Sequence, residues 1–316
     1  MTEAGSEAVV ADALEKRFRE TRALAGLSFR VSRGELFGFV GPDGAGKTTL
    51  FRILATLMVP DGGGARVLGR DVVADLWTLR PRIGYMPGRF SLYPDLSVLE
   101  NLRFFASVFG TTIERERERI APIYRQLERF NDRRAAALSG GMKQKLALCC
   151  ALVHRPEILF LDEPTTGVDA VSRREFWDLL GALKQDGMTI VVSTPYMDEA
   201  ARCDRVALIQ QGRLLATDRP ERIAASFERP LLAVHVGDRY RALRALRDMP
   251  HAHAVYPFGE TLHYTDARAG AVSEAVADDV RAFLAARGFD GVRVEAAAPS
   301  VEDVFIARMG APEGAA

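Results

Sequence analysis

Apolar runs of two kinds alternate along the first two thirds of the chain. Before Glu35, short alternating runs such as LSFRV at Leu27–Val31 predict half-buried antiparallel strands. Solid apolar runs that end at polar or glycine-containing turns then follow at Leu36–Val40, Ile158–Leu161, Ile190–Val192 and Arg205–Ile209. Such runs are typical of parallel strands covered on both faces by helices. We therefore expect an α/β fold with a mostly parallel sheet and an antiparallel β subdomain.

The segment from Leu99 to Val153 has helical periodicity, and we expect a helical subdomain at about 90–153. It includes a helix predicted at Thr112–Phe130, whose IERERERI run alternates Glu with Arg. These charges can pair at helical spacing, so the run predicts a solvated helix, not a nucleic-acid patch. A further helix is predicted after Val192, where Thr194 can cap it and Pro195 suits its first position.

After Asp218 the pattern changes to that of a smaller domain. A helix and linker end at Pro230, and the elements that follow are a strand at Leu231–Val236, a helix at Asp238–Arg247, short strands around Val255 and His263, a helix at Ala271–Arg287 and a strand at Val292–Ala296. This βαββαβ order predicts a ferredoxin-like α+β domain. Ser300–Met309 reads as a capped terminal helix. We expect domains at 1–228 and 229–316.

Composition narrows the class of protein. The chain has 316 residues, 48% hydrophobic and 27% charged, with zero net charge, which gives no indication of a nucleic-acid partner. Cys149, Cys150 and Cys203 have neither disulfide nor zinc spacing and suit buried positions in a reducing compartment. His251 and His253 could share a strand face, but without a third ligand we do not expect a metal there. No signal peptide or apolar run of about 20 residues is visible, so we expect a cytoplasmic protein.

A phosphate-binding loop follows the first solid strand. GPDGAGKTT satisfies G-x-x-x-x-G-K-[ST] between a strand and a helix-like segment. The residues expected to bind the nucleotide are Gly41, Pro42, Asp43, Gly44, Ala45, Gly46, Lys47, Thr48 and Thr49. The glycines let backbone amides point at phosphate oxygens, and the helix that follows adds positive charge. Lys47 would reach the β and γ phosphates, and Thr48 would offer its hydroxyl to magnesium.

Two further motifs supply a pair of carboxylates and the backbone amides at the start of a helix. ILFLDEP brings Asp162 and Glu163 to the carboxyl end of a strand, where ligands collect in open α/β sheets. Asp162 suits a magnesium ligand, and Glu163 suits the group that polarises the attacking water. LSGGMKQ begins a helix with Ser139, Gly140 and Gly141, an anion site with no phosphate of its own in the same chain.

With the TTGVD run at Thr165–Asp169, these motifs resemble those of ABC-transporter ATPases over residues 8–220. The resemblance implies a P-loop ABC ATPase fold, ATP and magnesium as ligands, and Lys47 and Glu163 as catalytic residues. It also implies a dimer in which the signature residues, Ser139 with its two glycines, close on ATP held by the opposing subunit. An integral-membrane permease would then hold the chain at the inner face of the plasma membrane. Phe18 sits where the family places an aromatic that stacks on adenine.

Two positions depart from the family. Its usual glutamine after the third strand is Gly88 here, and its switch histidine is Pro195. The site should therefore bind magnesium-ATP and hydrolyse it slowly, paired with a second ATPase subunit whose own site is complete. Two alternatives stay open. One is a homodimer in which Tyr196, Ser193 or Arg89 makes the missing contacts, and the other is a non-hydrolysing regulatory subunit.

The type of transporter is suggested by several further stretches. The phosphate loop, the missing histidine and YMDEA resemble the first, irregular half of tandem exporter ATPases, and one phosphate loop in the chain fits a split pair. PSVEDVFIARMG resembles the ending of drug, sodium and polysaccharide exporter ATPases. Soluble ABC proteins that act on DNA or ribosomes mostly carry two phosphate loops or coiled-coil insertions, which are not found here. In the Phe90–Phe109 stretch we expect Phe90, Leu92 and Tyr93 nearest a permease-docking groove, although most of it should build the core of the subdomain.

Overall fold

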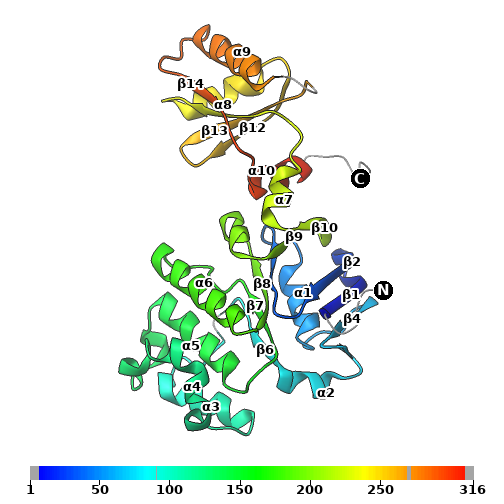
Figure 1. Cartoon of the computed structure of the whole chain (residues 1–316), viewed down its shortest axis with the longest axis vertical. Coiled ribbons are helices and arrows are strands. Elements are labelled where there is room, and N and C mark those ends of the chain that lie inside the picture. The colour runs from blue at the N-terminus through cyan, green and yellow to red at the C-terminus, as the bar shows by residue number, and fades with distance from the viewer. Residues whose placement is uncertain (1–6, 90, 269–271, 310–316) are drawn as a thin grey trace. The chain divides into compact units, whose positions relative to one another are not determined.

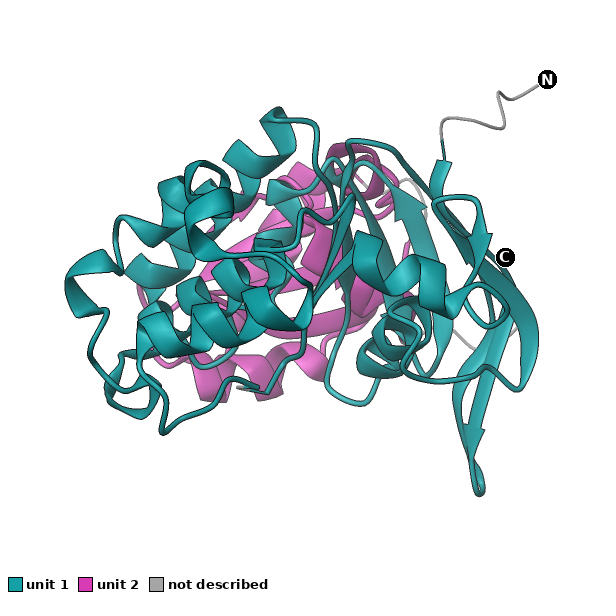
Figure 2. Cartoon of the chain, turned by 90° about the horizontal axis from the view of Figure 1, so that it is seen from below, with its two compact units in different colours: residues 1–220 teal, residues 221–316 magenta. Residues whose placement is uncertain are grey.

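The computed structural model describes residues 7–89, 91–268 and 272–309 (Figure 1). The chain divides into two compact units, residues 1–220 and 221–316 (Figure 2). This division falls at the start of helix α7 (Pro220–Ala225), whereas the boundary that the sequence suggested, after residue 228, lies beyond the end of that helix. Among the described residues, none of the helices combines the length and apolar character required to span a bilayer.

A six-stranded sheet forms the centre of the first unit. Its strands, in spatial order, are β10 (Arg213–Asp218), β9 (Arg205–Gln210), β3 (Leu36–Val40), β8 (Thr189–Thr194), β7 (Ile158–Asp162) and β6 (Ile83–Met86). All neighbouring pairs are parallel except β9 with β10. Every residue of β3, β7 and β8 is buried, which confirms the strands that their unbroken apolar runs predicted.

An antiparallel sheet packs beside the central one. Its strands are β2 (Thr21–Ser32), β1 (Glu7–Phe18), β4 (Gly62–Val67) and β5 (Arg70–Asp71), in that order. Helix α1 (Lys47–Leu54) shares its core, where the Phe39 ring makes edge contacts with Phe29 at 4.9 Å and Phe51 at 6.0 Å between centroids. This apolar cluster fixes the start of α1 relative to β3, and hence the loop between them.

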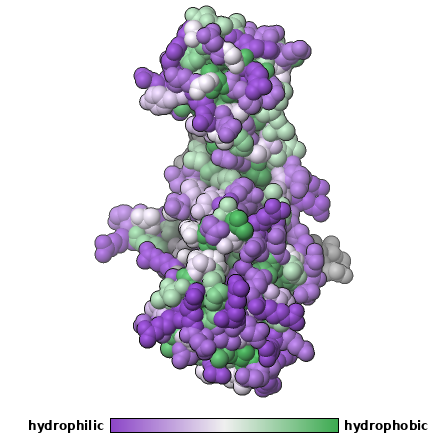
Figure 3. All heavy atoms as spheres, turned by 90° about the vertical axis from the view of Figure 1, so that its left-hand side faces the viewer, coloured by the Kyte–Doolittle hydropathy of each residue, from purple (hydrophilic) through white to green (hydrophobic). Residues whose placement is uncertain are grey.

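Helices lie on the opposite side of the central sheet, two of them packed against its strands and two packed on those helices (Figure 1). They are α3 (Val98–Val108), α4 (Ile113–Tyr124), α5 (Gly140–Leu152) and α6 (Ala170–Gln185), and short helical turns complete the unit at α2 (Leu76–Leu79), η1 (Arg80–Arg82), η2 (Glu128–Phe130) and η3 (Ala135–Ala137). Figure 3 shows this side of the unit as mostly hydrophilic, with separate hydrophobic areas.

Two helix predictions in this unit need correction. The helix expected at Thr112–Phe130 ends at Tyr124, shortly after Pro122, whose ring cannot continue the hydrogen-bonded ladder. Its charged run is not wholly solvated, because Glu116 is 4% exposed and pairs with Arg155. After β8 there is no α-helix capped by Thr194. Instead, a 3₁₀ helix, η4 (Met197–Arg202), begins after Tyr196.

The second unit has the predicted βαββαβ order. Its elements after α7 are β11 (Leu231–His235), α8 (Arg239–Arg247), β12 (Ala252–Phe258), β13 (Thr261–Asp266), α9 (Ser273–Ala285), β14 (Arg293–Ala296) and α10 (Val301–Met309). The antiparallel sheet has the order β12-β13-β11-β14, which confirms the ferredoxin-like arrangement. His251 precedes β12 at a φ of 67°, so it does not share a strand face with His253.

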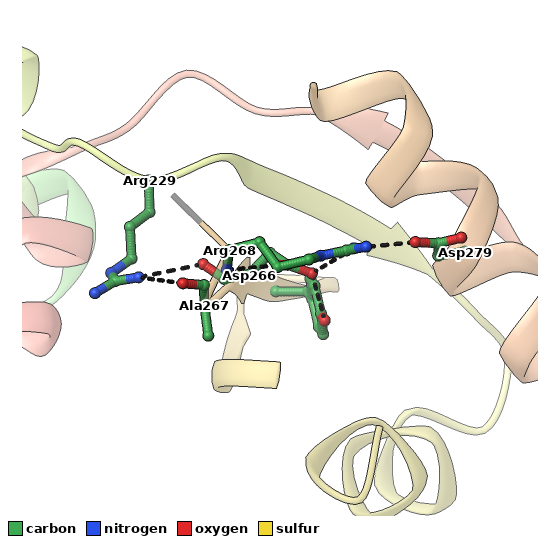
Figure 4. A network of polar contacts seen from close by, with 6 residues as sticks. Arg229, Asp266, Ala267, Arg268 and Asp279 are labelled. Atoms are coloured by element: carbon green, nitrogen blue, oxygen red, sulfur yellow. Dashed lines mark hydrogen bonds and ion pairs between the residues drawn. The ribbon is translucent and has the colours of Figure 1, made fainter. Parts of the chain in front are cut away.

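Paired charges brace the end of β13 (Figure 4). Asp266 is fully buried and accepts hydrogen bonds from Arg268, which also pairs with Asp279 on α9 at 3.0 Å. Arg229 donates to the backbone oxygens of Asp266 and Ala267. Burial disfavours ionisation of Asp266, but the hydrogen bonds from Arg268 outweigh it and lower the pKa of that carboxyl. The network is structural, since each buried charge in it has a partner.

Candidate nucleotide-binding site

The phosphate loop leaves the end of β3 through contacts that only glycine permits. The amide of Gly41 donates to the Thr194 oxygen at 3.2 Å, and a Cβ on Gly41 would lie 2.0 Å from the Ile209 oxygen. Gly46 precedes α1 at a φ of 105°, with the Ala23 oxygen 2.4 Å from the place of its missing Cβ. A side chain at either position would therefore collide with the backbone of β9 or β2, so the loop needs glycine at both.

Lys47 extends back across this loop from the first position of α1. Its side chain is 2% exposed, and its Nζ donates to the oxygens of Gly41 at 2.7 Å and Pro42 at 2.9 Å. It also lies 3.1 Å from Glu163 Oε1. A buried ammonium whose partners are loop carbonyls and one carboxylate is chemically suited to bind phosphate oxygens at the same loop.

The two carboxylates at the end of β7 lie beside β8. Asp162 is 1% exposed and accepts a hydrogen bond from the Ser193 hydroxyl at 2.7 Å. Burial raises the pKa of Asp162, while hydrogen bonds from Ser193 and Thr48 oppose that rise. The structure thus brings together Thr48 and Asp162, the hydroxyl and carboxylate expected to hold magnesium. Because both offer hard oxygen ligands, this pair fits the ion.

Glu163 has a strained backbone. Its φ is 49°, in the left-handed region that favours glycine. The amide of Glu163 donates to the Ser193 oxygen at 3.1 Å and hydroxyl at 3.0 Å, so β8 fixes this conformation. Strain of this kind persists only where the surrounding structure enforces it, and it often marks a functional residue.

The two departures from the family pattern lie in the loops that follow β6 and β8, the strands on either side of β7. A Cβ on Gly88 would approach the Asp162 oxygen to 3.0 Å, so the loop after β6 rests directly on the end of β7 and contributes no side chain. Pro195 follows β8, half-buried, and has neither an amide hydrogen nor a side-chain donor. Of the residues considered as substitutes, Ser193 reaches Asp162, Tyr196 lies against Arg173, and Arg89 is exposed.

The signature residues lie at the start of α5, as predicted. Ser139 caps the helix, with its hydroxyl accepting from the Met142 amide at 3.3 Å. A Cβ on Gly141 would lie 2.5 Å from the side chain of Ser172, the third residue of α6. The second signature glycine is therefore needed for the packing of α5 against α6. Phe18, at the end of β1, is 45% exposed, which leaves its ring accessible for stacking.

A buried acidic residue that the sequence analysis did not identify lies beside the ends of β7 and β8. Glu199 is 3% exposed and accepts hydrogen bonds from Thr165 and Thr194, and it pairs with Arg173. Its sequence signal is weak, because YMDEA reads simply as the polar start of a helix. Among the described residues, histidines, cysteines and carboxylates nowhere gather in threes to form a protein-only metal site.

Comparisons with known proteins agree with this geometry. The family described as "ABC transporter" matches residues 24–166. The chain is similar to the "Probable multidrug ABC transporter ATP-binding protein YbhF" of Escherichia coli K12, with 43% identity over 70% of the chain but only 39% of that relative. It is 36% identical to the "Nod factor export ATP-binding protein I" of Rhizobium sp. N33, covering 94% of the chain and 95% of the relative.

A solved structure shares the fold of the first unit. The dimeric structure of MJ0796, described as a bacterial ABC transporter cassette, superposes with a TM-score of 0.60 and 26% identity, covering 67% of this chain and 98% of that one. Together, the loop of Gly41–Thr49, the carboxylate pair and the near full-length match to an export ATP-binding protein lead to one conclusion: the chain belongs to the ABC transporter family of ATP-binding proteins.

Proposed function

We propose that the chain is an ATP-hydrolysing subunit of an ABC exporter, with Lys47 and the phosphate loop binding ATP and Glu163 polarising the attacking water. Thr48 and Asp162 would hold magnesium, which neutralises charge on the phosphates when bound. Phe18 would stack on adenine. The observation that carries this proposal is the convergence of Lys47 and Glu163, 3.1 Å apart, at the mouth of a glycine-walled loop.

We also propose that the site is slow and non-equivalent within a dimer. Lys47 and Glu163 are in place, yet positions 88 and 195 provide no side-chain donor for the γ-phosphate or the water. One preorganised donor contributes about 10²–10³-fold in rate, so losing two should slow turnover severely without removing binding. The second ATPase subunit would use the intact signature residues of this chain, as in the first half of a tandem exporter ATPase.

A homodimer is the second candidate, and Ser193 favours it. Its hydroxyl on β8 already lies beside the carboxylate-bearing end of β7, 2.7 Å from Asp162, and could take over one missing contact. ATP turnover and oligomeric state, measured for the purified chain alone and with the ATPase encoded beside it, separate the two. Full-speed turnover by the chain alone would remove the heterodimer. No ATP binding at all would remove the proposed function itself.

The partner that carries substrate would be an integral-membrane permease docked on the helical subdomain. A groove of about 330 Å³ opens there, and its lining includes Leu57, Tyr85, Leu92, Val108, Phe109 and His154. Of the three residues expected near it, Leu92 lines it, Tyr93 instead packs on Phe104 at 4.7 Å, and Phe90 lies outside the described residues. Through the permease the chain would lie at the inner face of the plasma membrane.

Docking at this groove can be tested by changing its charge. Val108 is 61% exposed at its edge, so Val108→Asp should reduce co-purification with the permease without unfolding the chain. Val171, 69% exposed on α6 and not part of the groove lining, offers Val171→Asp as a matched control. Equal co-purification of the two variants would count against docking here.

A further inference from the structure

Glu199 is a buried carboxylate outside the nucleotide-binding motifs. It lies in η4, is 3% exposed, and is bonded on both oxygens. Oε1 accepts from the Thr165 hydroxyl at 2.8 Å and lies 3.4 Å from Arg173 Nε, and Oε2 accepts from the Thr194 hydroxyl at 2.5 Å. A buried carboxylate with three such partners holds them firmly, because breaking any bond leaves an uncompensated buried group.

Two of these partners lie next to the nucleotide site in the sequence, one just after β7 and the other at the end of β8. Thr165 is two residues after Glu163 and is 1% exposed. Thr194 is the last residue of β8, next to Ser193, and it is fully buried. One carboxylate therefore joins the segment after Glu163 to the strand whose Ser193 binds both Asp162 and the Glu163 amide.

The strained backbone at Glu163 requires such support. A non-glycine residue at a φ of 49° is stable only when its neighbours on both sides are fixed. Ser193 fixes the amide of Glu163, and the Thr165–Glu199 bond fixes the chain just beyond it. Lys47 at 3.1 Å and the Thr166 hydroxyl at 3.5 Å contact the Glu163 carboxylate directly, whereas Glu199 anchors the backbone that follows it.

Arg173 extends the connection towards the signature residues. Its guanidinium pairs with Glu199 and with Asp198 at 2.7 Å, and lies 4.6 Å from the centre of the Tyr196 ring. Arg173 follows Ser172, the residue against which Gly141 packs. The same cluster thus contacts the end of β8 and includes the residue of α6 next to Ser172, against which the signature helix α5 packs.

We propose that Glu199 is a positioning residue for Glu163, and that Arg173 links this position to the signature helix. The inference rests on the proposed function, since it assigns Glu163 the water-polarising role. Glu199 touches no nucleotide in this scheme. It sets the direction of the Glu163 carboxylate, so its loss should lower kcat for ATP hydrolysis and leave ATP affinity nearly unchanged.

The test compares Glu199→Ala with Asp198→Ala in the full chain. Asp198 is the adjacent acid, also paired with Arg173, but its side chain is 68% exposed and no hydrogen bond joins it to Thr165 or Thr194. We expect Glu199→Ala to lower kcat at least tenfold with the ATP dissociation constant within about threefold of wild type. Asp198→Ala should keep kcat within about twofold. Equal kcat values for the two variants would overturn the proposal.

A conservative pair of variants at Thr165 separates the loss of one hydrogen bond from a general loss of folding. Thr165→Val removes one hydrogen bond to Glu199 while keeping the shape of the side chain, and Thr165→Ser keeps the hydroxyl. We expect the valine variant to lose about three- to tenfold in kcat and the serine variant to recover most of it. A purely structural role would lower the melting temperature of Thr165→Val and leave kcat per folded site unchanged.

Hydrogen exchange provides a readout that does not depend on turnover. Glu199→Ala should speed exchange of the amides at 163–169 at least tenfold, because the segment beyond Glu163 loses its anchor. Asp198→Ala should leave these amides as in wild type. Unchanged exchange in Glu199→Ala would overturn the positioning role, whereas failure of the wild-type chain to bind ATP would overturn the proposed function instead.

Discussion

Replacing Pro195 by histidine tests whether a single missing donor limits the rate. Pro195 follows Thr194 at the end of β8, and β8 pairs in parallel with β7, with Ser193 opposite Asp162. A side chain at position 195 therefore leaves the strand next to the one that carries both carboxylates. The position is half-buried, so an imidazole can be accommodated with one face in solvent.

The expected gain follows from the value of one donor. A preorganised donor to a developing oxyanion contributes about 10²–10³-fold. Gly88 still supplies no second group, and the imidazole must settle beside the Tyr196–Arg173 pair, so we expect a smaller gain for Pro195→His of about 10- to 100-fold in kcat. This corresponds to about 1.4–2.7 kcal/mol off the activation barrier. The KM for ATP should change by less than about threefold, because Lys47 and the loop are untouched.

The assay is phosphate release at saturating magnesium-ATP, with Pro195→Ala as the control. Alanine removes the ring and restores an amide without adding an imidazole, so it separates backbone effects from the donor. The gain should vanish in the double variant Pro195→His with Glu163→Gln, since both groups act on the same step. Equal rates for Pro195→His and Pro195→Ala would refute the reasoning, and the slow site would need another cause.

Three further predictions address binding, packing and pH. Lys47→Ala should weaken ATP binding at least tenfold in a fluorescent-nucleotide titration while leaving the melting temperature of the first unit within a few degrees, because the phosphate cradle loses the Lys47 ammonium but the core is intact. Gly141→Ala should cost about 1–3 kcal/mol in the free energy of unfolding, since its Cβ would lie 2.5 Å from Ser172, whereas Gly181→Ala, at a helical position with open space, should be neutral or stabilising in the same denaturation assay. In the second unit, burial opposes ionisation of Asp303, but hydrogen bonds from His263, Ser300 and Tyr256 outweigh it and hold its pKa at about 2, below the ordinary 3.8. Asp303 therefore contributes about 2 kcal/mol to the free energy of unfolding above pH 3.8, and this contribution is lost as the pH falls towards 2. Protection of α10 amides from hydrogen exchange should follow that loss in the wild type, and should already be low at pH 7 in Asp303→Asn.

The sequence determined the elements and the chemistry of the site because both depend on local signals. An unbroken apolar run such as Leu36–Val40 can only be satisfied by burial on both faces, and it became β3 as expected. The glycine spacing of the phosphate loop, Asp162 and Glu163 after β7, and Ser139 before α5 were all identified from motifs a few residues long. The missing donors at Gly88 and Pro195 were equally visible, since an absent side chain needs no structure to be recognised.

Tertiary structure alone decided which groups meet and how they are held. The hydrogen bond from Ser193 to Asp162 joins residues 31 positions apart, and its existence depends on β7 and β8 being neighbours in parallel register. The left-handed backbone at Glu163 and the burial of Glu199 likewise come from long-range packing. The missing α-helix after Thr194 shows the same limit: the Thr194 hydroxyl accepts from the Tyr196 amide at 3.0 Å, a local bond that the sequence suggests, but it also donates to the buried Glu199, a partner that only the fold provides. Local patterns report what a segment can do, and only the folded chain decides which of its possible partners is within reach.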